Sequence, residues 1–167
     1  MVGHWLVKQE PSAYSWKNLE NDRETEWNGV HSALALRHLR EMRVGDFAVF
    51  YHSGDERACV GILRVVRGPK PDPDDERGSW TVRVRPVRKL RRPVPLAEIR
   101  DDPKFAGFDL LRNSRLSVMP VSEGHWASLL AHENRDVGAP PDPTEARSGR
   151  GKASASPPRG SGAKRRR

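Results

Sequence analysis

Two apolar runs of strand length, FAVFYHS at 47–53 and ACVGILRVV at 58–66, are separated by a short segment that contains Gly54 and Asp55. Glycine and aspartate between two such runs are a turn signal, so the pair predicts an antiparallel β-hairpin. A third run, WTVRVRPVRKL at 80–90, alternates valine with arginine, which is typical of a strand with one buried face. These runs predict a mainly antiparallel sheet around which the rest of the chain must fold.

Shorter patterns predict the elements around this sheet. Further strands are expected at 4–9 and 116–121, and helices at 15–21, 31–42, 95–101 and after Ser122. The segment GPKPDPDDERG at 68–78 is too polar and too rich in proline for a strand, so we expect a loop. Strands outnumber helices and do not alternate with them. The predicted class is therefore α+β, with a curled sheet or small barrel and short helices at its ends.

The net positive charge is confined to the end of the chain. The 167 residues carry 30 basic and 22 acidic side chains, a formal net charge of +8. Residues 146–167 contain eight of the basic side chains and none of the acidic ones, so the preceding residues are balanced. From Asp136 onward the composition cannot bury enough apolar surface to order a chain. We expect one domain at 1–135 and a disordered basic tail at 136–167 that attracts phosphates without sequence preference.

No pattern indicates a membrane span, a disulfide or a metal site. The chain has neither an apolar run long enough to cross a bilayer nor a secretory signal pattern. Cys59 is the single cysteine, and the pairs His31/His38 and His125/His132 have a spacing of seven, which is not the i, i+4 spacing of helical metal ligands. We expect a soluble monomer without metal or cofactor, in a bacterial cytoplasm; the terminal KRRR makes the nucleus the alternative.

Seven aromatic residues gather in the first 27 residues and in one predicted strand: Trp5, Tyr14, Trp16, Trp27, Phe47, Phe50 and Tyr51. Most of them are expected in the core, where aromatic side chains dominate the packing. Trp27 and Tyr51 differ because Asn-Gly follows the first and His-Ser follows the second. Aromatic faces beside hydrogen-bonding groups are what a pocket for a planar base needs.

A basic cluster occupies the third strand and its end: Arg83, Arg85, Arg88, Lys89, Arg91 and Arg92. A strand face of one sign without interspersed acids exceeds what solubility requires, which favours a ridge that contacts phosphates. The alternative is a solvated face that keeps the sheet soluble.

Several motifs together resemble the EVE domain family of the PUA-like group. They are WLVKQEP, YSW, W-x-G-V at 27–30, VGDFAVFYHS at 44–53, VGI at 60–62 and RLSVMPVSEGHW at 115–126. Their order and spacing make the resemblance specific over about residues 3–132. It implies a PUA-like pseudobarrel with flanking helices and a pocket for a modified nucleobase, such as methylated or hydroxymethylated cytosine in DNA, or a modified base in RNA. It implies a reader and not an enzyme.

The matching motif positions supply candidate site residues. Those expected to line a base pocket, centred on a cleft between Trp27 and Tyr51, are Trp27, Gly29, Val30, Tyr51, His52, Ser53 and Ser117. Phosphate or polar contacts are expected from Lys8, Glu10 and Arg115, and from Arg83 and Arg85 of the basic cluster. The step from Lys8 to Glu10 is expected to face the ligand, whereas Trp5 and Trp16 hold the scaffold.

One segment departs from the pattern of the family. After W-x-G-V the family usually continues with Arg-Asn-Tyr-Gln-Ala-Arg-Asn, whereas this chain has HSALALR at 31–37 and keeps only Ala35. If this segment touches the ligand, the protein prefers a different base from its relatives or its site has decayed.

Three functions follow from these patterns. The first is a nucleic-acid-binding reader of a modified base. The second is an enzyme that acts on a nucleotide or nucleic acid through the same pocket, although His52, Ser53 and Asp55 do not indicate a catalytic triad, because neighbours on a strand point to opposite faces. The third is a protein-interaction adaptor with a vestigial pocket.

Overall fold

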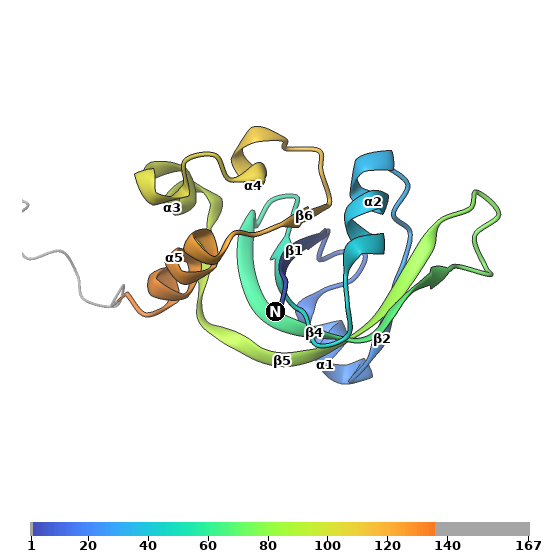
Figure 1. Ribbon diagram of the computed structural model, residues 1–167. Helices are drawn as coiled ribbons and strands as arrows, with labels where there is room; N and C mark the ends of the chain where they lie inside the picture. The colour runs from blue at the N-terminus through green and yellow to red at the C-terminus, as the bar shows by residue number, and fades with distance from the viewer. Residues whose placement is uncertain (1, 136–167) are drawn as a thin grey trace, which may run out of the picture. The chain divides into compact units, whose positions relative to one another are not determined.

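The computed structural model describes residues 2–135, which form a single curled sheet with short helices packed around it (Figure 1). The sheet has six strands in the order β2-β5-β4-β3-β1-β6. Four of its five strand pairs are antiparallel, and β1 with β3 is the parallel pair. The predicted α+β pseudobarrel with a mainly antiparallel sheet is confirmed. The predicted tail, residues 136–167, lies outside the described residues.

The predicted hairpin forms the centre of the sheet. Strands β3 (Phe47–His52) and β4 (Ala58–Pro71) pair in antiparallel register from Phe47 opposite Arg64 to His52 opposite Ala58. Strand β5 (Trp80–Pro95) then pairs along β4, and both bend strongly across the view in Figure 1. The bend and the bulges between β4 and β5 curl the sheet into a half-barrel.

The predicted loop at 68–78 is wrong at its start, because β4 continues to Pro71. Lys70 lies opposite Thr81, and Pro71 lies opposite Trp80. Strand β3 pairs with β4 only as far as Arg64, so beyond that point one edge of β4 has no neighbouring strand among residues 2–135. A proline cannot donate a ladder hydrogen bond, and a free edge does not require one. Two prolines are therefore compatible with this end of the strand.

Three short strands complete the sheet. Strand β1 (His4–Gln9) lies between β3 and β6 (Val118–Pro120), and β2 (Thr25–Trp27) pairs with β5 at the other edge. The sequence predicted β1 and the region of β6, but it did not predict β2. Strand β2 is only three residues long and contains a glutamate, so it has no apolar alternation to identify it.

Three of the helices begin directly after a serine that caps them. Ser15 and Asn18 form a capping box for α1 (Trp16–Asp22), Ser32 caps α2 (Ala33–Glu41), and Ser122 caps α5 (Glu123–Glu133). The remaining helical segments are α3 (Leu96–Asp101), the 3-10 turn η1 (Pro103–Phe105) and α4 (Asp109–Arg112). Within residues 2–135, no helix is long and apolar enough to span a membrane.

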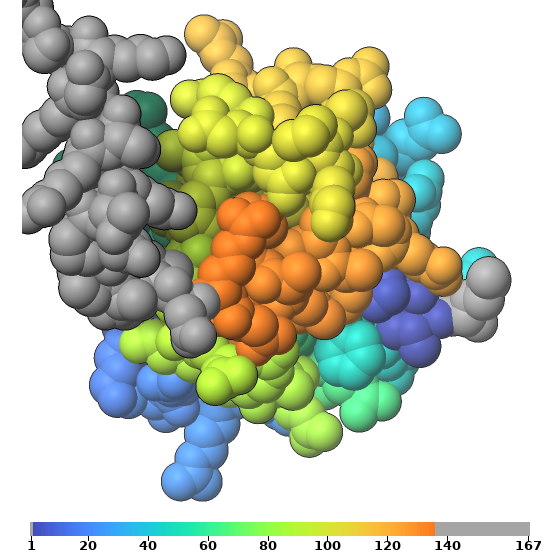
Figure 2. Space-filling view, turned by 90° about the vertical axis from the view of Figure 1, so that its left-hand side faces the viewer, coloured from blue at the N-terminus to red at the C-terminus, as the bar shows by residue number. Residues whose placement is uncertain are grey.

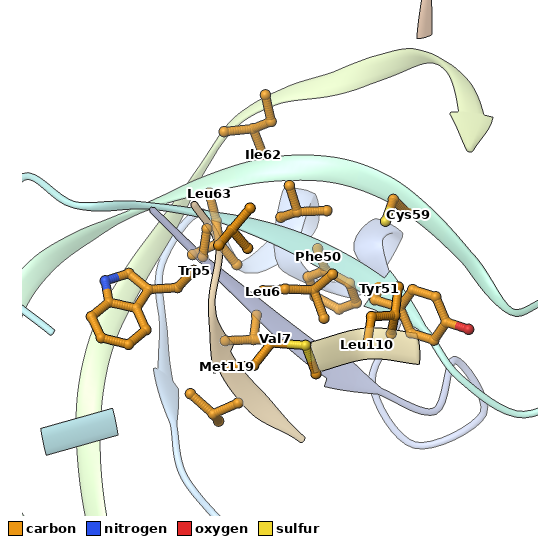
Figure 3. Packing of buried hydrophobic residues seen from close by; sticks show 14 of the residues in the cluster. Trp5, Leu6, Val7, Phe50, Tyr51, Cys59, Ile62, Leu63, Leu110 and Met119 are labelled. Atoms are coloured by element: carbon orange, nitrogen blue, oxygen red, sulfur yellow. The ribbon is translucent and has the colours of Figure 1, made fainter. Parts of the chain in front are cut away.

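Phe50 of β3 lies at the centre of the core (Figure 3). The rings of Trp16 and Trp27 pack edge-on against it, with ring centroids 5.8 Å and 5.3 Å away. The prediction that most aromatic residues belong to the core is confirmed for Trp5, Trp16 and Phe50, and Trp27 and Tyr51, which the sequence set apart as ligand contacts, are buried as well.

Helix α5 packs against β5 and η1, and Figure 2 shows it beside the segment that contains α3 and α4. Charged groups hold this contact. His132 of α5 places its two ring nitrogens 3.0 Å from Glu98 and 2.8 Å from Asp102, and Glu133 pairs with Arg88 of β5. These interactions fix the position of α3, whose Leu96 and Arg100 border a cavity described below.

Candidate functional site

Strand β1 separates two cavities at the end where Lys8 and Gln9 stand. Lys8 lies opposite Tyr51 of β3, and Gln9 lies opposite His52. Successive residues of a strand point to opposite faces of the sheet. Gln9 consequently lines a cavity on one face and Lys8 lines a cavity on the other. We name them the Trp27 cavity and the Lys8 cavity.

The Trp27 cavity has a volume of about 320 Å³. Its lining combines two aromatic rings with amide, hydroxyl and carboxylate groups: Gln9, Tyr14, Thr25, Glu26, Trp27 and Asn28. The residues come from the end of β1, the approach to α1 and the whole of β2. A small polar cavity with aromatic walls can accept a planar, hydrogen-bonding ligand.

Contacts outside the cavity hold its two aromatic residues in place. Trp27 is 5% exposed and packs against Phe50, so most of its ring belongs to the core and only an edge reaches the cavity. The hydroxyl of Tyr14 donates a 2.8 Å hydrogen bond to Asp22. Burial raises the pKa of Tyr14, so the phenol stays neutral. After Asn28, Gly29 adopts a φ of +74°, a left-handed conformation that favours glycine and turns the chain away from β2.

Glu26 is the charged group of the Trp27 cavity, and it is firmly bound. Both terminal nitrogens of Arg67 lie 2.8 Å from its carboxylate oxygens, and Thr81 and Arg83 donate to it at 2.9 Å. Burial alone would raise the pKa of Glu26, but these hydrogen bonds and the two arginine charges lower it below its ordinary value. The carboxylate is ionised and fixed in place.

The Lys8 cavity has a volume of about 380 Å³ and a different chemical character. Its lining has three cationic side chains, three hydroxyl groups, a glycine and two leucines: Lys8, Arg57, Arg100, Tyr51, Ser53, Ser114, Gly54, Leu96 and Leu110. The ammonium of Lys8 lies 2.9 Å from the carbonyl oxygen of Ser114 and 5.7 Å from the centre of the Tyr51 ring. No carboxylate lines this cavity among the residues that the structure describes.

The sequence suggested that Trp27 and Tyr51 line one cleft, and this prediction is wrong. They lie on opposite faces at the end of β1, one in each cavity. That the step from Lys8 to Glu10 faces a ligand stays a prediction; Lys8 lines one cavity and Gln9 lines the other. Glu10 is exposed, and its carboxylate borders Gly54 at the rim of the Lys8 cavity.

Four predicted pocket residues line neither cavity: Gly29, Val30, His52 and Ser117. The Nε2 atom of His52 accepts a 3.0 Å hydrogen bond from the backbone N–H of Trp16, so the proton of the neutral ring is on Nδ1, which donates to Glu56 at 2.6 Å. Val30 is buried, and its carbonyl oxygen accepts a bond from Ser79. The carbonyl oxygen of Ser117 accepts the backbone N–H of Lys8. Their contacts support the ends of β1, β2 and β3.

The basic cluster is not a face of one sign. Arg83 binds Glu26, Arg88 binds Glu133, and Arg92 binds Glu98, each at 2.9 Å or less. Glu26 of β2 and Glu133 of α5 are far away in the sequence, whereas Glu98 of α3 follows Arg92 by six residues. The predicted phosphate-contacting ridge assumed arginines without acidic partners, and this assumption is wrong for these three arginines. Arg85 and Arg115 are exposed and line neither cavity.

The atypical segment 31–37 also lies away from both cavities. Ser32 and the residues after it begin α2, whose Ala35 is buried, while His31 forms a 2.6 Å contact with Asp75 of the β4–β5 connection. Neither cavity takes a lining residue from this segment. Its departure from the usual family pattern therefore leaves the walls of the two cavities unchanged.

Sequence patterns missed several lining residues. Tyr14 and Asn28 were visible as an aromatic residue and as the neighbour of Trp27, but Thr25 and Glu26 carry no local signal because β2 was not recognised. Arg57 and Arg100 are two arginines among many in the sequence, and only the fold brings them beside Lys8.

Known proteins with similar sequences share this fold. A family model described as the EVE domain matches residues 3–132. Thymocyte nuclear protein 1 of Homo sapiens is 26% identical over 171 residues, covering 81% of this chain and 76% of that protein. The solved structure of Rpa0253 from Rhodopseudomonas palustris is 34% identical, covers 83% of this chain and 99% of its own, and has a TM-score of 0.75.

A second solved structure is that of human THYN1 protein in complex with DNA that contains 5-methylcytosine. It is 27% identical, covers 80% of this chain and 99% of its own, and has a TM-score of 0.74. The match of the family model spans nearly all the residues that the structure describes. This protein therefore belongs to the EVE domain family.

Proposed function

We propose that the protein is a DNA-binding reader that accepts an extruded modified cytosine in the Trp27 cavity. The observation that carries the proposal is the lining of this cavity, in which two aromatic rings stand beside two primary amides. The related human protein has been solved with DNA containing 5-methylcytosine, which supports the same class of ligand for this chain.

The groups in the Trp27 cavity complement the edge of cytosine. The exocyclic amino group of cytosine donates hydrogen bonds, whereas its N3 and O2 atoms accept them. The amides of Gln9 and Asn28 offer both donors and acceptors, and Thr25 adds a hydroxyl. The ring of Tyr14 and the exposed edge of Trp27 supply apolar surface for a 5-methyl group and for the base.

A base can enter this cavity only after the base has left the duplex, because the lining groups can contact a single base and not a base pair. Extrusion costs a few kcal/mol of lost stacking and pairing. The described part of the chain has many neutralised arginines, such as Arg67, Arg83 and Arg88. We infer that contacts in the cavity supply the selectivity and that the basic residues of 146–167 add attraction to phosphates.

The same geometry supports binding rather than catalysis. His52, the residue that an enzyme mechanism would use, has both ring nitrogens engaged by Trp16 and Glu56. The thiol of Cys59 is fully buried, and burial raises its pKa, so it is no nucleophile. Mass spectrometry of methylated and unmethylated oligonucleotides after prolonged incubation should show no product; a modified base in the product would overturn this part of the proposal.

Fluorescence anisotropy with matched oligonucleotides tests the reader function. Duplexes with one 5-methylcytosine, the same duplexes without it, and RNA of the same sequence are titrated with the full chain. We expect the methylated DNA to bind most tightly. Equal affinities that disappear when residues 146–167 are removed would mean that only the basic segment binds.

Asn28→Ala is the informative variant, because Asn28 is exposed at the cavity whereas Trp27 also supports the core. Loss of a base contact should weaken binding of methylated DNA about fivefold or more. Asn21→Ala is the matched control, since Asn21 is exposed on α1 and lines neither cavity. If the two variants bind methylated DNA equally well, the Trp27 cavity is not the base pocket.

A further inference from the structure

The Lys8 cavity gathers three positive charges from distant parts of the chain. Lys8 comes from β1, Arg57 from the β3–β4 turn, and Arg100 from α3. In residues 2–135, none of these three forms an ion pair with a carboxylate. Arg88 and Arg92, in contrast, bind Glu133 and Glu98 closely. The fold thus leaves a concentration of positive charge in a concave site.

Hydroxyl groups stand among these charges. Tyr51, Ser53 and Ser114 all line the cavity. Figure 3 shows the ring of Tyr51 reaching past Leu110 with its hydroxyl at the outer end. Burial, more than any other cause, raises the pKa of Tyr51 to about 12, so its hydroxyl stays protonated and can donate. Cations and neutral hydroxyl donors around one space form an anion site.

Two residues of this cavity, Lys8 and Arg57, are held in conditions that cost free energy. Lys8 is partly buried with a backbone carbonyl as its hydrogen-bond acceptor, and burial lowers its pKa. Arg57 has a φ of +46°, a left-handed conformation that strains a residue with a side chain. The backbone N–H of Leu96 donates to the carbonyl oxygen of Arg57 at 2.8 Å and helps to hold the turn in this conformation.

We propose that the Lys8 cavity binds a phosphate group. Three cationic side chains and three hydroxyls provide enough donors for the oxygens of one phosphate, and the flanking Leu96 and Leu110 leave room for an apolar part of the ligand. The phosphate is either a terminal phosphomonoester or a phosphodiester of a nucleic-acid backbone. This inference does not depend on the reading of a modified base, because the Trp27 cavity lies on the other face of β1.

Isothermal titration of the full chain with inorganic phosphate tests the site directly. Saturable binding is expected for the natural sequence, and Arg100→Gln and Lys8→Met should each weaken it about tenfold or more. Arg85→Gln is the matched control, because Arg85 is exposed on β5 and lines neither cavity. Circular dichroism verifies that each variant is folded. Absence of saturable binding, or equal weakening in all three variants, would overturn the proposal.

Oligonucleotides distinguish the two sources of the phosphate. Short single strands with a 5′-phosphate or a 5′-hydroxyl are compared in the natural sequence and in Arg100→Gln. A terminal ligand predicts that the 5′-phosphate strengthens binding and that Arg100→Gln removes this gain. A backbone ligand predicts that Arg100→Gln weakens both strands equally. If Arg100→Gln changes the binding of neither strand, the site does not bind phosphate of nucleic acids and the proposal fails for both sources.

Two variants separate this proposal from the reader function. Arg100→Gln should keep the preference for methylated over unmodified DNA, and Asn28→Ala should keep the affinity for inorganic phosphate. If Arg100→Gln instead loses the preference while Asn28→Ala keeps it, the base enters the Lys8 cavity and the division of roles between the two cavities is wrong.

Discussion

The indole ring of Trp16 lies against the backbone of Gly61, so close that a Cβ atom at Gly61 would stand 2.5 Å from two carbons of the ring. The ring cannot easily move aside. Its Nε1 atom donates a 2.7 Å hydrogen bond to Glu20, and its other edge packs against Phe50. The first helix is therefore seated on β4 at a position that admits only glycine.

Gly61→Ala should lower the free energy of unfolding by about 1–3 kcal/mol, the usual cost of overpacking a core. Urea titration followed by tryptophan fluorescence measures the change. Gly124→Ala is the matched control, because a Cβ there meets nothing within 4 Å and alanine favours the helix in which Gly124 stands. Equal stability of the two variants would mean that Trp16 does not constrain Gly61.

Asp46 ties the N-terminal segment to the sheet. One of its carboxylate oxygens accepts the backbone N–H of Gly3 at 2.8 Å, and the other accepts the indole N–H of Trp5 and the backbone N–H of Arg43, both at 2.9 Å. Asp46 is 5% exposed, so water cannot replace these bonds easily.

Asp46→Asn should therefore cost about 2–4 kcal/mol of stability, since an amide nitrogen cannot accept the bonds that one oxygen receives. Thermal unfolding followed by circular dichroism measures the loss. The control is Asp55→Asn in the exposed β3–β4 turn, which should change stability little. A midpoint for Asp46→Asn equal to that of the control would contradict the assigned role.

Local sequence signals predicted the local parts of this fold. Gly54 and Asp55 marked the β3–β4 hairpin, and Ser15 and Ser122 marked the first turns of α1 and α5. These features depend on neighbouring residues, and so a single sequence displays them. Strand β2 and the parallel pairing of β1 with β3 depend on partners far along the chain, which no local pattern specifies.

The site was harder to predict for the same reason. Trp27 and Tyr51 were recognised as candidate ligand contacts. They line separate cavities, because Lys8 and Gln9 are neighbours on β1 and point to opposite faces of the sheet. The basic cluster looked uncompensated because its acidic partners, such as Glu133, come from other elements. Charge balance in three dimensions cannot be counted along one strand.

The pair of Arg88 and Glu133 should make stability dependent on pH. The hydrogen bond from Arg88 lowers the pKa of Glu133 in the folded protein below its ordinary value of 4.5. A lowered pKa gives stability that is present above the ordinary value and is lost as the pH falls through the folded value. The pKa values of Glu98 and Asp102 are also lowered, so they act in the same direction.

Arg88→Met should destabilise the protein by about 1–3 kcal/mol at neutral pH, less than for a fully buried pair because Arg88 is 43% exposed. The difference from the natural sequence should shrink as the pH falls below the ordinary value of 4.5 and through the lowered pKa of Glu133. Urea titrations across this pH range measure it, with Arg85→Met as the control on the same strand. A difference that does not change with pH would assign the effect to packing alone.

The eight basic residues of 146–167 should affect DNA binding without affecting selectivity. Contacts with phosphates are independent of sequence and weaken as salt rises, with a slope of about 0.9 in log affinity against log salt for each neutralised phosphate. Removal of 146–167 should therefore lower the affinity for methylated and unmodified duplexes by the same factor and reduce the salt slope by up to about 7. Anisotropy titrations at several salt concentrations measure both quantities. Because the base contacts lie in the Trp27 cavity, the ratio of the two affinities should stay constant; a ratio that falls on truncation would mean that this segment takes part in reading the base.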